Sequence, residues 1–419
     1  MSLAGLAQGA AVNVAARVGA MALALAVLVV VARMGPAVQG AFALFVAVES
    51  VLLTLGSGFG VALARRLSHH GDDAAAPLRA ALRAATWAGV VAALVLAVVA
   101  VAVPRAPYRD LRLLALAAPL LLWVPTASGL WLGRAQMGRL NAPQVAQPLA
   151  MFAALALVAS LAGGDALRAV LVAWLLARVL VALATAALAL REAPGDPAAV
   201  EAQRGVDWRF VAAVGATNVV TVLNYRVPLF LVEREAGLEA TGVYSVTVQL
   251  AELLWLLSSA LSVSAYRRIG EPGRERAAHT ALDAARVGVL AALVAAPLLW
   301  GLALWAVPRV LGAGYDGVAT PLALLLPGVV AYAAASAVSA YFTNQLGRPG
   351  WAGRVAALSL VLNTLGCLWA VPRYGAAGAA ASTSLSYLIA IVAAWAVFLR
   401  AAGLPPGALW SAGRRQSAP

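Results

Sequence analysis

The sequence predicts an all-α polytopic membrane protein with about twelve transmembrane helices in two six-helix lobes. Three observations carry this prediction: the composition, the number of apolar stretches and an internal repeat. Of the 419 residues, 63% are hydrophobic and only 11% are charged, and the mean hydropathy is +0.88. Soluble globular proteins have about 45–50% apolar and about 25% charged residues. The main solvent of this chain is therefore a bilayer.

Each predicted helix is a mainly apolar stretch long enough to cross the hydrocarbon core, which takes roughly 20 residues. Barrel strands would instead alternate apolar and polar residues over about ten positions, and these stretches do not. The first six predicted spans cover residues 10–33, 37–62, 80–103, 111–133, 143–162 and 166–190. The second six cover residues 209–232, 239–265, 281–307, 318–343, 351–371 and 376–400.

The arginines predict the orientation. With the N-terminus in the cytoplasm, most arginines fall in cytoplasmic loops and in the C-terminal tail, as the positive-inside rule requires. The same rule explains the net charge of +13, so no nucleic-acid partner is expected. Both termini are therefore predicted to be cytoplasmic. The opposite loops hold only Arg105, Arg109, Arg112, Arg168, Arg234, Arg309 and Arg373.

A polar segment near the middle divides the chain into two similar lobes. We predict an N-terminal lobe at 1–192, a cytoplasmic linker at 193–208, a C-terminal lobe at 209–400 and a cytoplasmic tail at 401–419. Six helices in each lobe give the repeats the same orientation, so their pseudo-twofold axis is expected along the membrane normal. Two-lobed repeats of this kind are typical of secondary transporters.

The repeat is visible as a series of corresponding residues that occur in the same order after the first helix of each lobe. Gly40 and Phe42 correspond to Gly242 and Tyr244, and a glutamate follows in each lobe. An arginine pair then closes each segment at the same offset from its glycine. The paired elements are Glu49 with Glu252, Arg65–Arg66 with Arg267–Arg268, and Gly138–Arg139 with Gly347–Arg348.

Polar residues within the predicted spans are the candidate functional residues. An ionisable group at mid-bilayer costs about 2.5–3.5 kcal/mol on insertion scales, so it usually faces a bundle interior or a wet cavity. One alternative is structural: Glu49 and Arg17 could pair across neighbouring helices only to satisfy each other. For Arg226 a role in a cavity is favoured. The candidate binding residues are Asn13, Arg17, Arg178, Asn218 and Arg226, with Glu233 on the stripe of Asn218 and Arg226, and the candidate coupling residues are Glu49 and Glu252.

No enzymatic or metal-binding motif is found in the sequence. It has no Walker loop, no HExxH and no GxSxG. The single cysteine, Cys367, excludes an intrachain disulfide, and the three histidines, at positions 69, 70 and 279, form no ligand set. Transport without a cofactor, a metal or a catalytic residue is the expected class of function.

Three segments resemble a known family. The stretch LNTLGCLWAVPRYGAAGAAASTSLSYL, residues 362–388, has an Asn in an apolar helix, a Pro-x-x-Gly turn and a small-residue run. The segments RMGPAVQGAFALFVAVESVLLTLGSGFGVALAR and NYRVPLFLVEREAGLEATGVYSVTVQLAELL supply a Gly-Pro before Gly-x-Phe and a Gly-x-Tyr-Ser-Val element. Together these are similar to the polysaccharide biosynthesis, or O-antigen (Wzx-type), flippases of the multidrug/oligosaccharidyl-lipid/polysaccharide (MOP) exporter superfamily.

The resemblance implies two six-helix bundles and alternating access that carries an undecaprenyl-diphosphate-linked oligosaccharide across the bacterial inner membrane. Arg17, Arg178 and Arg226 would hold the diphosphate, because guanidinium forks suit phosphate oxygens. Glu49 and Glu252 would couple transport to protons or sodium. The expected partners are the lipid-linked oligosaccharide, membrane lipids, and a polysaccharide polymerase or glycosyltransferases.

One departure from the family pattern and several alternatives stand beside this reading. In the family an acid often follows the arginine of the seventh helix, whereas here Val227 and Pro228 follow Arg226 and the nearest acid is Glu233. A local ion pair or proton relay at this position is therefore in doubt. The alternatives are a drug or cation antiporter of the same superfamily, a lipid II flippase, and a non-transporting scaffold subunit.

The small-residue run that begins the last span, within residues 371–395, is expected to serve packing first. Gly and Ala allow helix backbones to approach closely, and Ser or Thr can hydrogen-bond across the contact.

Overall fold

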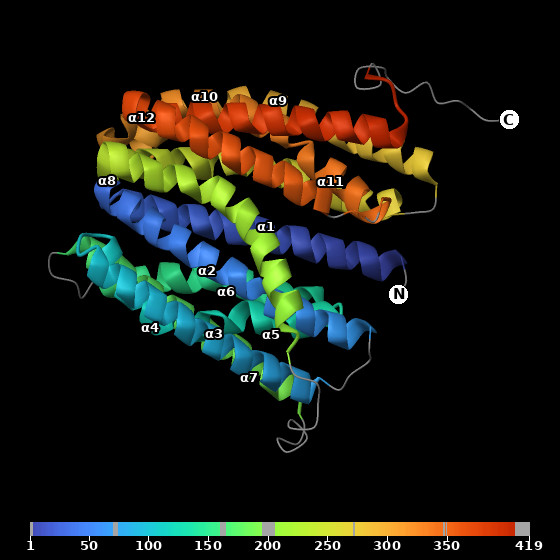
Figure 1. The fold of residues 1–419 in the computed structure, drawn as a ribbon. Helices are drawn as coiled ribbons and strands as arrows, with labels where there is room; N and C mark the ends of the chain where they lie inside the picture. Colours follow the sequence, from blue (N-terminus) through green and yellow to red (C-terminus); the bar gives the residue numbers. More distant parts are fainter. Residues whose placement is uncertain are drawn as a thin grey trace. The chain divides into compact units, whose positions relative to one another are not determined.

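The computed structural model describes residues 3–69, 74–159, 165–194, 206–270, 273–346, 348 and 350–406. Within its helices, the side chains of residues 3–14, 17, 69, 159, 256–268, 270, 336 and 344 lie outside this description. The described residues form helices joined by short connections, with no β-strand among them (Figure 1). The predicted all-α membrane fold is confirmed.

The helices follow the predicted spans closely. The first seven are α1 (Leu3–Ala32), α2 (Pro36–His69), α3 (Ala75–Ala102), α4 (Leu111–Leu121), α5 (Trp123–Gly133), α6 (Met137–Ala159) and α7 (Ala166–Glu192). The remaining five are α8 (Trp208–Gly270), α9 (Arg274–Leu311), α10 (Ala319–Tyr332), α11 (Ala335–Asn344) and α12 (Gly350–Ala402). Two short 3₁₀ segments, η1 (Tyr108–Asp110) and η3 (Ala313–Val318), precede α4 and α10.

The described helices are consistent with twelve membrane crossings. Nine helical stretches in the described residues are long and apolar enough to cross a bilayer. Two of these, Trp208–Trp255 and Gly350–Ala402, lie in α8 and α12, each of which has one non-helical residue, Gly237 or Gly375. Counting each as two crossings, and adding the shorter apolar helix Val18–Ala32, gives the predicted number. The chain is a multi-pass membrane protein.

The chain divides into two compact units, Met1–Leu223 and Asn224–Pro419. The boundary lies inside α8, so residues 208–223 of this helix belong to the first unit. Trp208 packs edge-on against Phe59 of α2, with ring centroids 5.4 Å apart. Nearby, the backbone of Val211 lies so close to Gly58 that a Cβ there would meet the carbonyl oxygen at 2.3 Å. The lobe limits given above, with the linker at 193–208, stay a prediction.

The connection between the first two helices of each unit turns at a glycine in the same register. Gly35 has φ +116° and Gly237 has φ +83°, and each stands five positions before its repeat glycine, Gly40 or Gly242. Positive φ is strained for residues with a Cβ and free for glycine. The sequence repeat therefore extends to a repeated backbone conformation.

The fourth membrane segment of each unit is broken into two helices. The break lies at Leu122 between α4 and α5, and at residues 333–334 between α10 and α11. A proline precedes each break, Pro119 in α4 and Pro327 in α10. Proline removes a backbone donor and clashes with the preceding turn, which kinks or ends helices.

The small-residue run of α12 packs as the sequence predicts. Gly328 of α10 lies so close to α12 that a Cβ at this position would stand 2.4 Å from the Cα of Ser384. The Oγ of Ser384 accepts a hydrogen bond from the backbone N–H of Gly328 at 2.8 Å. Gly378 makes a similar approach to the carbonyl of Ala370, across the break at Gly375. Close backbone contact and a hydroxyl hydrogen bond thus occur together, as expected for small residues in membrane helices.

Candidate functional site

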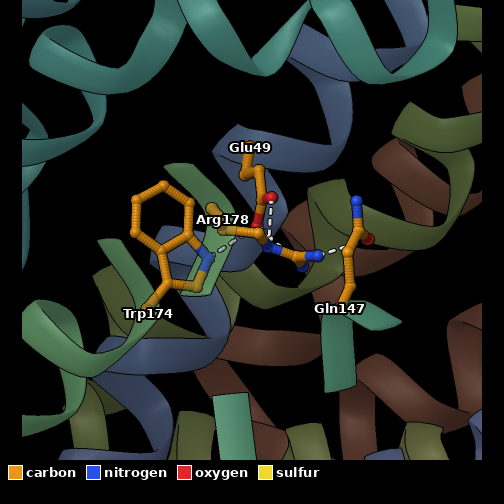
Figure 2. Close-up of polar contacts among 4 residues, drawn as sticks. All are labelled: Glu49, Gln147, Trp174 and Arg178. Carbon is orange, nitrogen blue, oxygen red and sulfur yellow. Dashed lines mark hydrogen bonds and ion pairs between the residues drawn. The ribbon is translucent and has the colours of Figure 1, made fainter. Parts of the chain in front are cut away.

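A buried ion pair occupies the middle of the first unit. Glu49 of α2 is only 1% exposed, and its Oε1 lies 2.8 Å from Nε of Arg178 on α7. Its Oε2 accepts a hydrogen bond from the indole Nε1 of Trp174 at 2.9 Å. The Nη1 of Arg178 donates to Oε1 of Gln147 on α6 (Figure 2). Three helices therefore contribute polar groups to one cluster, which we call the Glu49 cluster.

The Glu49 cluster satisfies its charges internally. A charge taken out of water is costly unless it is paired and hydrogen-bonded. Glu49 has both oxygens engaged, and Arg178 is paired on one edge, although 20% of its side chain remains exposed. On the apolar side, the ring of Phe45 packs edge-on against the ring of Trp174, with the two centroids 4.8 Å apart. Glu49 is thus buried and paired, but its partner is Arg178 and not Arg17, the partner considered from the sequence.

Arg17 and Asn13 belong to α1, but their side chains lie outside the described residues. The predicted pairing of Glu49 with Arg17 therefore has no support, and Arg17 stays a candidate from sequence alone. Asn218 is exposed in the first unit and donates a hydrogen bond from Nδ2 to Oγ of Ser57 at 3.1 Å. The three residues are not brought together by any described contact.

The second unit holds a carboxylate beside an aromatic cluster. Glu252 of α8 lines a small cavity of about 20 Å³, and the other walls include Tyr225, Tyr244, Trp255 and Tyr387. The rings contact one another: the Tyr225 and Trp255 centroids are 5.2 Å apart, and Tyr387 lies 4.8 Å from Tyr332. A cavity of this size admits about one water molecule or a small ion. We call this group the Glu252 pocket.

Arg226 lies one residue after Tyr225 on the same helix and is half-buried. It is close enough to Glu252 for an electrostatic interaction between the two side chains. Glu233, two turns further along α8, is 5% exposed. The second unit thus brings together two of the sequence-predicted residues, Arg226 and Glu252.

A chain of neutral polar groups lies buried next to the Glu252 pocket. Asn363 of α12 donates from Nδ2 to the backbone carbonyl of Asn224 at 3.0 Å, and its Oδ1 accepts from Oγ1 of Thr383 at 3.1 Å. Thr383 in turn lies 3.3 Å from the hydroxyl of Tyr244, which lines the pocket. Asn224 also exchanges hydrogen bonds with Ser359. This Asn363 network ties the two halves of α12 to α8.

Sequence reasoning missed several of these partners. Trp174 stands one turn before Arg178 on α7, a spacing that places both on one helix face, so its contact with Glu49 could have been suspected. Gln147, Tyr225, Tyr332 and Tyr387 come from distant segments with no shared spacing, and only the fold brings them together. Asn363 is the Asn of the motif in residues 362–388, and the sequence alone assigns it no role in binding.

The described residues contain no group of three or more His, Cys, Asp or Glu side chains that could hold a metal ion. A metal site built from protein ligands of these types is therefore not found in the described part of the chain.

Comparisons with known proteins identify the fold. No protein-family model matches the chain, and no curated protein matches its sequence. Among solved structures, an inward-facing multidrug resistance MATE family transporter of the MOP superfamily is similar with a TM-score of 0.72 and 16% identity, covering 94% of this chain and 96% of that chain. The lipid II flippase MurJ, in an inward closed conformation, gives 0.76 and 13% identity over 95% and 88% of the two chains.

A third neighbour is a MOP superfamily transporter from Pyrococcus furiosus Vc1 (DSM3638), with a TM-score of 0.65, 15% identity and 94% coverage of both chains. Its structure is described as having a binding pocket of reverse polarity that suggests a different function. At these identities the likeness concerns the fold alone. Nearly the whole of this chain has the fold of the MOP superfamily transporters.

Proposed function

We propose that this protein is a flippase for an undecaprenyl-diphosphate-linked oligosaccharide, working by alternating access in the bacterial inner membrane. The cargo would serve the synthesis of a cell-surface polysaccharide such as O-antigen, capsule or exopolysaccharide. The observation that carries the proposal is Arg226, a half-buried guanidinium inside the apolar stretch Trp208–Trp255. Such a group in a membrane helix usually faces a bundle interior or a water-filled cavity. Guanidinium forks bind phosphate oxygens bidentately.

Two further observations support a lipid-linked cargo. The chain has the fold of a lipid II flippase over 95% of its length, and the sequence of 362–388 resembles the O-antigen flippases. We assign the diphosphate to Arg226, and Arg17, Asn13 and Asn218 stay candidate binding residues from the sequence. Arg178 takes part only through its exposed edge, because its Nε is committed to Glu49.

We assign ion coupling to Glu252 in preference to Glu49. The oxygens of Glu49 are held by Arg178 and Trp174, so a proton or sodium ion would have to displace an existing partner. Glu252 instead borders a cavity that admits a small ion, and it has Arg226 in electrostatic range. Binding of the cargo phosphate to Arg226 and binding of a cation to Glu252 would therefore both change the electrostatic interaction between these two side chains.

In the membrane we place both termini on the cytoplasmic side, following the arginine distribution. The partners would be the lipid-linked oligosaccharide, the surrounding lipids, and a polymerase or glycosyltransferases that supply or consume the glycan.

One observation favours a second candidate, a drug or cation antiporter. A carboxylate among tyrosine and tryptophan rings is a chemistry that recognises cations, through charge and through the faces of the rings. The Glu252 pocket has this chemistry, and the MATE neighbours are multidrug transporters. A lipid II flippase is the third candidate, on the likeness to MurJ.

The deciding experiment reconstitutes the full chain in proteoliposomes and follows flipping of a fluorescent undecaprenyl-diphosphate oligosaccharide. We expect transfer by the wild type and a loss of about tenfold or more in Arg226→Gln, since a charge-assisted hydrogen bond contributes about 1.5–3 kcal/mol. Arg354→Gln is the matched control, because Arg354 is exposed and stacks over Trp351 at 5.1 Å. Transfer of ethidium against a proton gradient, without glycan transfer, would support the antiporter instead.

A further inference from the structure

A second site lies on the first unit, and none of its lining residues belongs to the Glu49 cluster. It is a groove of about 970 Å³ between α3, the η1–α4 segment and α7. One end of the groove is charged and the rest is apolar. The apolar walls include Val90 and Leu94 of α3, Leu116 of α4 and Leu171 of α7, and the charged end has Arg109, Arg112, Arg168, Asp110 and Asp165.

The two acids at the charged end already have partners. Asp165 caps α7, because its Oδ1 accepts a hydrogen bond from the backbone N–H of Arg168 at 3.1 Å. Asp110 lies 3.7 Å from Nε of Arg109. Within the described residues, no ion pair engages the guanidinium groups of Arg112 and Arg168, and both residues are exposed. The groove therefore has two cationic groups available to an anion.

The apolar walls face outward from the unit. Leu94 is 63% exposed and Leu116 is 72% exposed, although both lie in apolar membrane helices. The charged residues lie on η1 (Tyr108–Asp110), in the first turn of α4 and at the start of α7, where apolar helices long enough to span a membrane begin. An occupant would thus have a long apolar part at membrane depth and an anionic group at the interface.

The arginine distribution adds independent weight. The orientation predicted from the sequence leaves only seven arginines in the loops opposite the cytoplasm. Three of these seven, Arg109, Arg112 and Arg168, line this one groove. Orientation alone does not require arginines on this side, since the positive-inside rule concentrates them on the other.

We propose that this groove binds an anionic membrane phospholipid from the leaflet opposite the cytoplasm. The phosphate lies against Arg112 and Arg168, whose planar guanidinium groups match phosphate geometry. An acyl chain lies along Leu94 and Leu116 and covers their exposed apolar surface. A phospholipid fits this groove because one molecule joins an anionic phosphate to long apolar chains, which matches arginines at one end and exposed leucines along the walls.

Native mass spectrometry of the detergent-solubilised full chain tests this site. The protein is equilibrated with equal amounts of phosphatidylglycerol and phosphatidylcholine, and the retained lipid is counted. We expect preferential retention of one phosphatidylglycerol per chain. The double variant Arg112→Gln/Arg168→Gln should lower this retention about tenfold, because it removes both charges that would pair with the phosphate and solvent screens exposed charges.

Two further variants make the result specific. Ala97 is an exposed wall residue of α3, so Ala97→Phe should fill the groove and lower retention while leaving the melting temperature unchanged. Arg309→Gln/Arg373→Gln is the matched control, because these exposed arginines stack over Trp305 and Trp369 in the second unit. Equal retention of both lipids, or unchanged retention in the double variant, would overturn the proposal. So would a bound second copy of the chain, or displacement of the phospholipid by equimolar undecaprenyl phosphate.

Discussion

The Nε of Arg178 lies 2.8 Å from Oε1 of Glu49, whose side chain is almost completely buried. The pair joins α7 to α2 within the first unit. Trp174 and Gln147 hydrogen-bond to it from two sides (Figure 2). The Glu49 cluster differs from an open ion-binding site, because its polar groups already pair and hydrogen-bond with one another.

Removing one member of this pair should destabilise the protein more than removing both. Glu49→Gln or Arg178→Gln leaves a buried charge without its partner, which typically costs about 3–5 kcal/mol. The double variant Glu49→Gln/Arg178→Gln should recover most of that loss. The melting temperature in detergent, read by size-exclusion chromatography after heating, checks this. A double variant as unstable as the sum of the singles would show that the charges are not coupled.

Glu252 should carry the ion dependence of transport. We expect Glu252→Gln to abolish the response of glycan flipping to an imposed proton or sodium gradient, because the neutral amide cannot exchange a cation. Passive exchange of the cargo should remain. Flipping is measured in the same proteoliposomes with and without each gradient. Asp283→Asn is the matched control, since Asp283 is exposed and paired with Arg286 at 3.1 Å. A gradient response that persists in Glu252→Gln would remove Glu252 from this role.

Gly328→Ala should lower stability because there is no room for a methyl group beside Ser384. The added Cβ would stand 2.4 Å from a backbone atom, and overpacking of this kind costs roughly 1–3 kcal/mol. Gly301→Ala is the matched control in α9, where nothing lies within 4 Å of the added atom. There the change should be neutral or slightly stabilising, by about 0.5–1 kcal/mol, since alanine favours helix over glycine. Equal melting temperatures for the two variants would contradict this packing account.

The helix breaks at Gly237 and Gly375 should also depend on glycine, here because of the backbone conformation and not because of packing. Gly237 has φ +83° with ψ −179° and Gly375 has φ +53° with ψ −132°, conformations that cost about 1–3 kcal/mol for other residues. Gly237→Ala and Gly375→Ala should each lower the melting temperature, whereas Gly138→Ala in α6, with open space around it, should not. The two breaks lie together, since a Cβ on Gly375 would be 3.8 Å from that of Ala236. If the alanine variants match the wild type, the breaks tolerate a side chain.

Asn363→Ala should destabilise the second unit more than Ser359→Ala does. Asn363 serves the carbonyl of Asn224 and the hydroxyl of Thr383, and a buried group left without its partner costs about 1–3 kcal/mol. Ser359 interacts only with the Asn224 side chain among the described contacts. Thermal unfolding of both variants, followed by tryptophan fluorescence, compares them. A larger loss in Ser359→Ala would mean that the network centres elsewhere.

The sequence predicts the membrane helices well because their signal is local. A run of about twenty apolar residues is enough to place a span, and the break before the last span falls at Gly375, between the predicted limits 371 and 376. The sequence does not predict the breaks inside the fourth segments. Pro119 and Pro327 lie within unbroken apolar runs, and proline is tolerated in membrane helices when neighbours satisfy the freed backbone groups.

The candidate site was less predictable, because burial and pairing are not local properties. From the sequence, Arg17 is the partner considered for a buried Glu49, and nothing in the spacing selects Arg178, which is far along the chain. The aromatic wall around Glu252 comes from α8, α10 and α12, and aromatic residues in membrane helices serve packing and interface roles as often as binding. Only the tertiary structure decides which polar residues share a neighbourhood.

The division of α8 between the two units has a consequence for cutting the chain. Residues 208–223 complete the first unit, through contacts such as Trp208 with Phe59 and Asn218 with Ser57, yet they follow the polar segment that joins α7 to α8. A protease nick in that polar segment would yield two fragments, neither of which matches a compact unit. The N-terminal fragment would lack residues 208–223, so the face of α2 that carries Phe59 would be uncovered until the C-terminal fragment supplied them. Fragments expressed separately should therefore depend on each other for folding, as in strand or helix exchange between subunits.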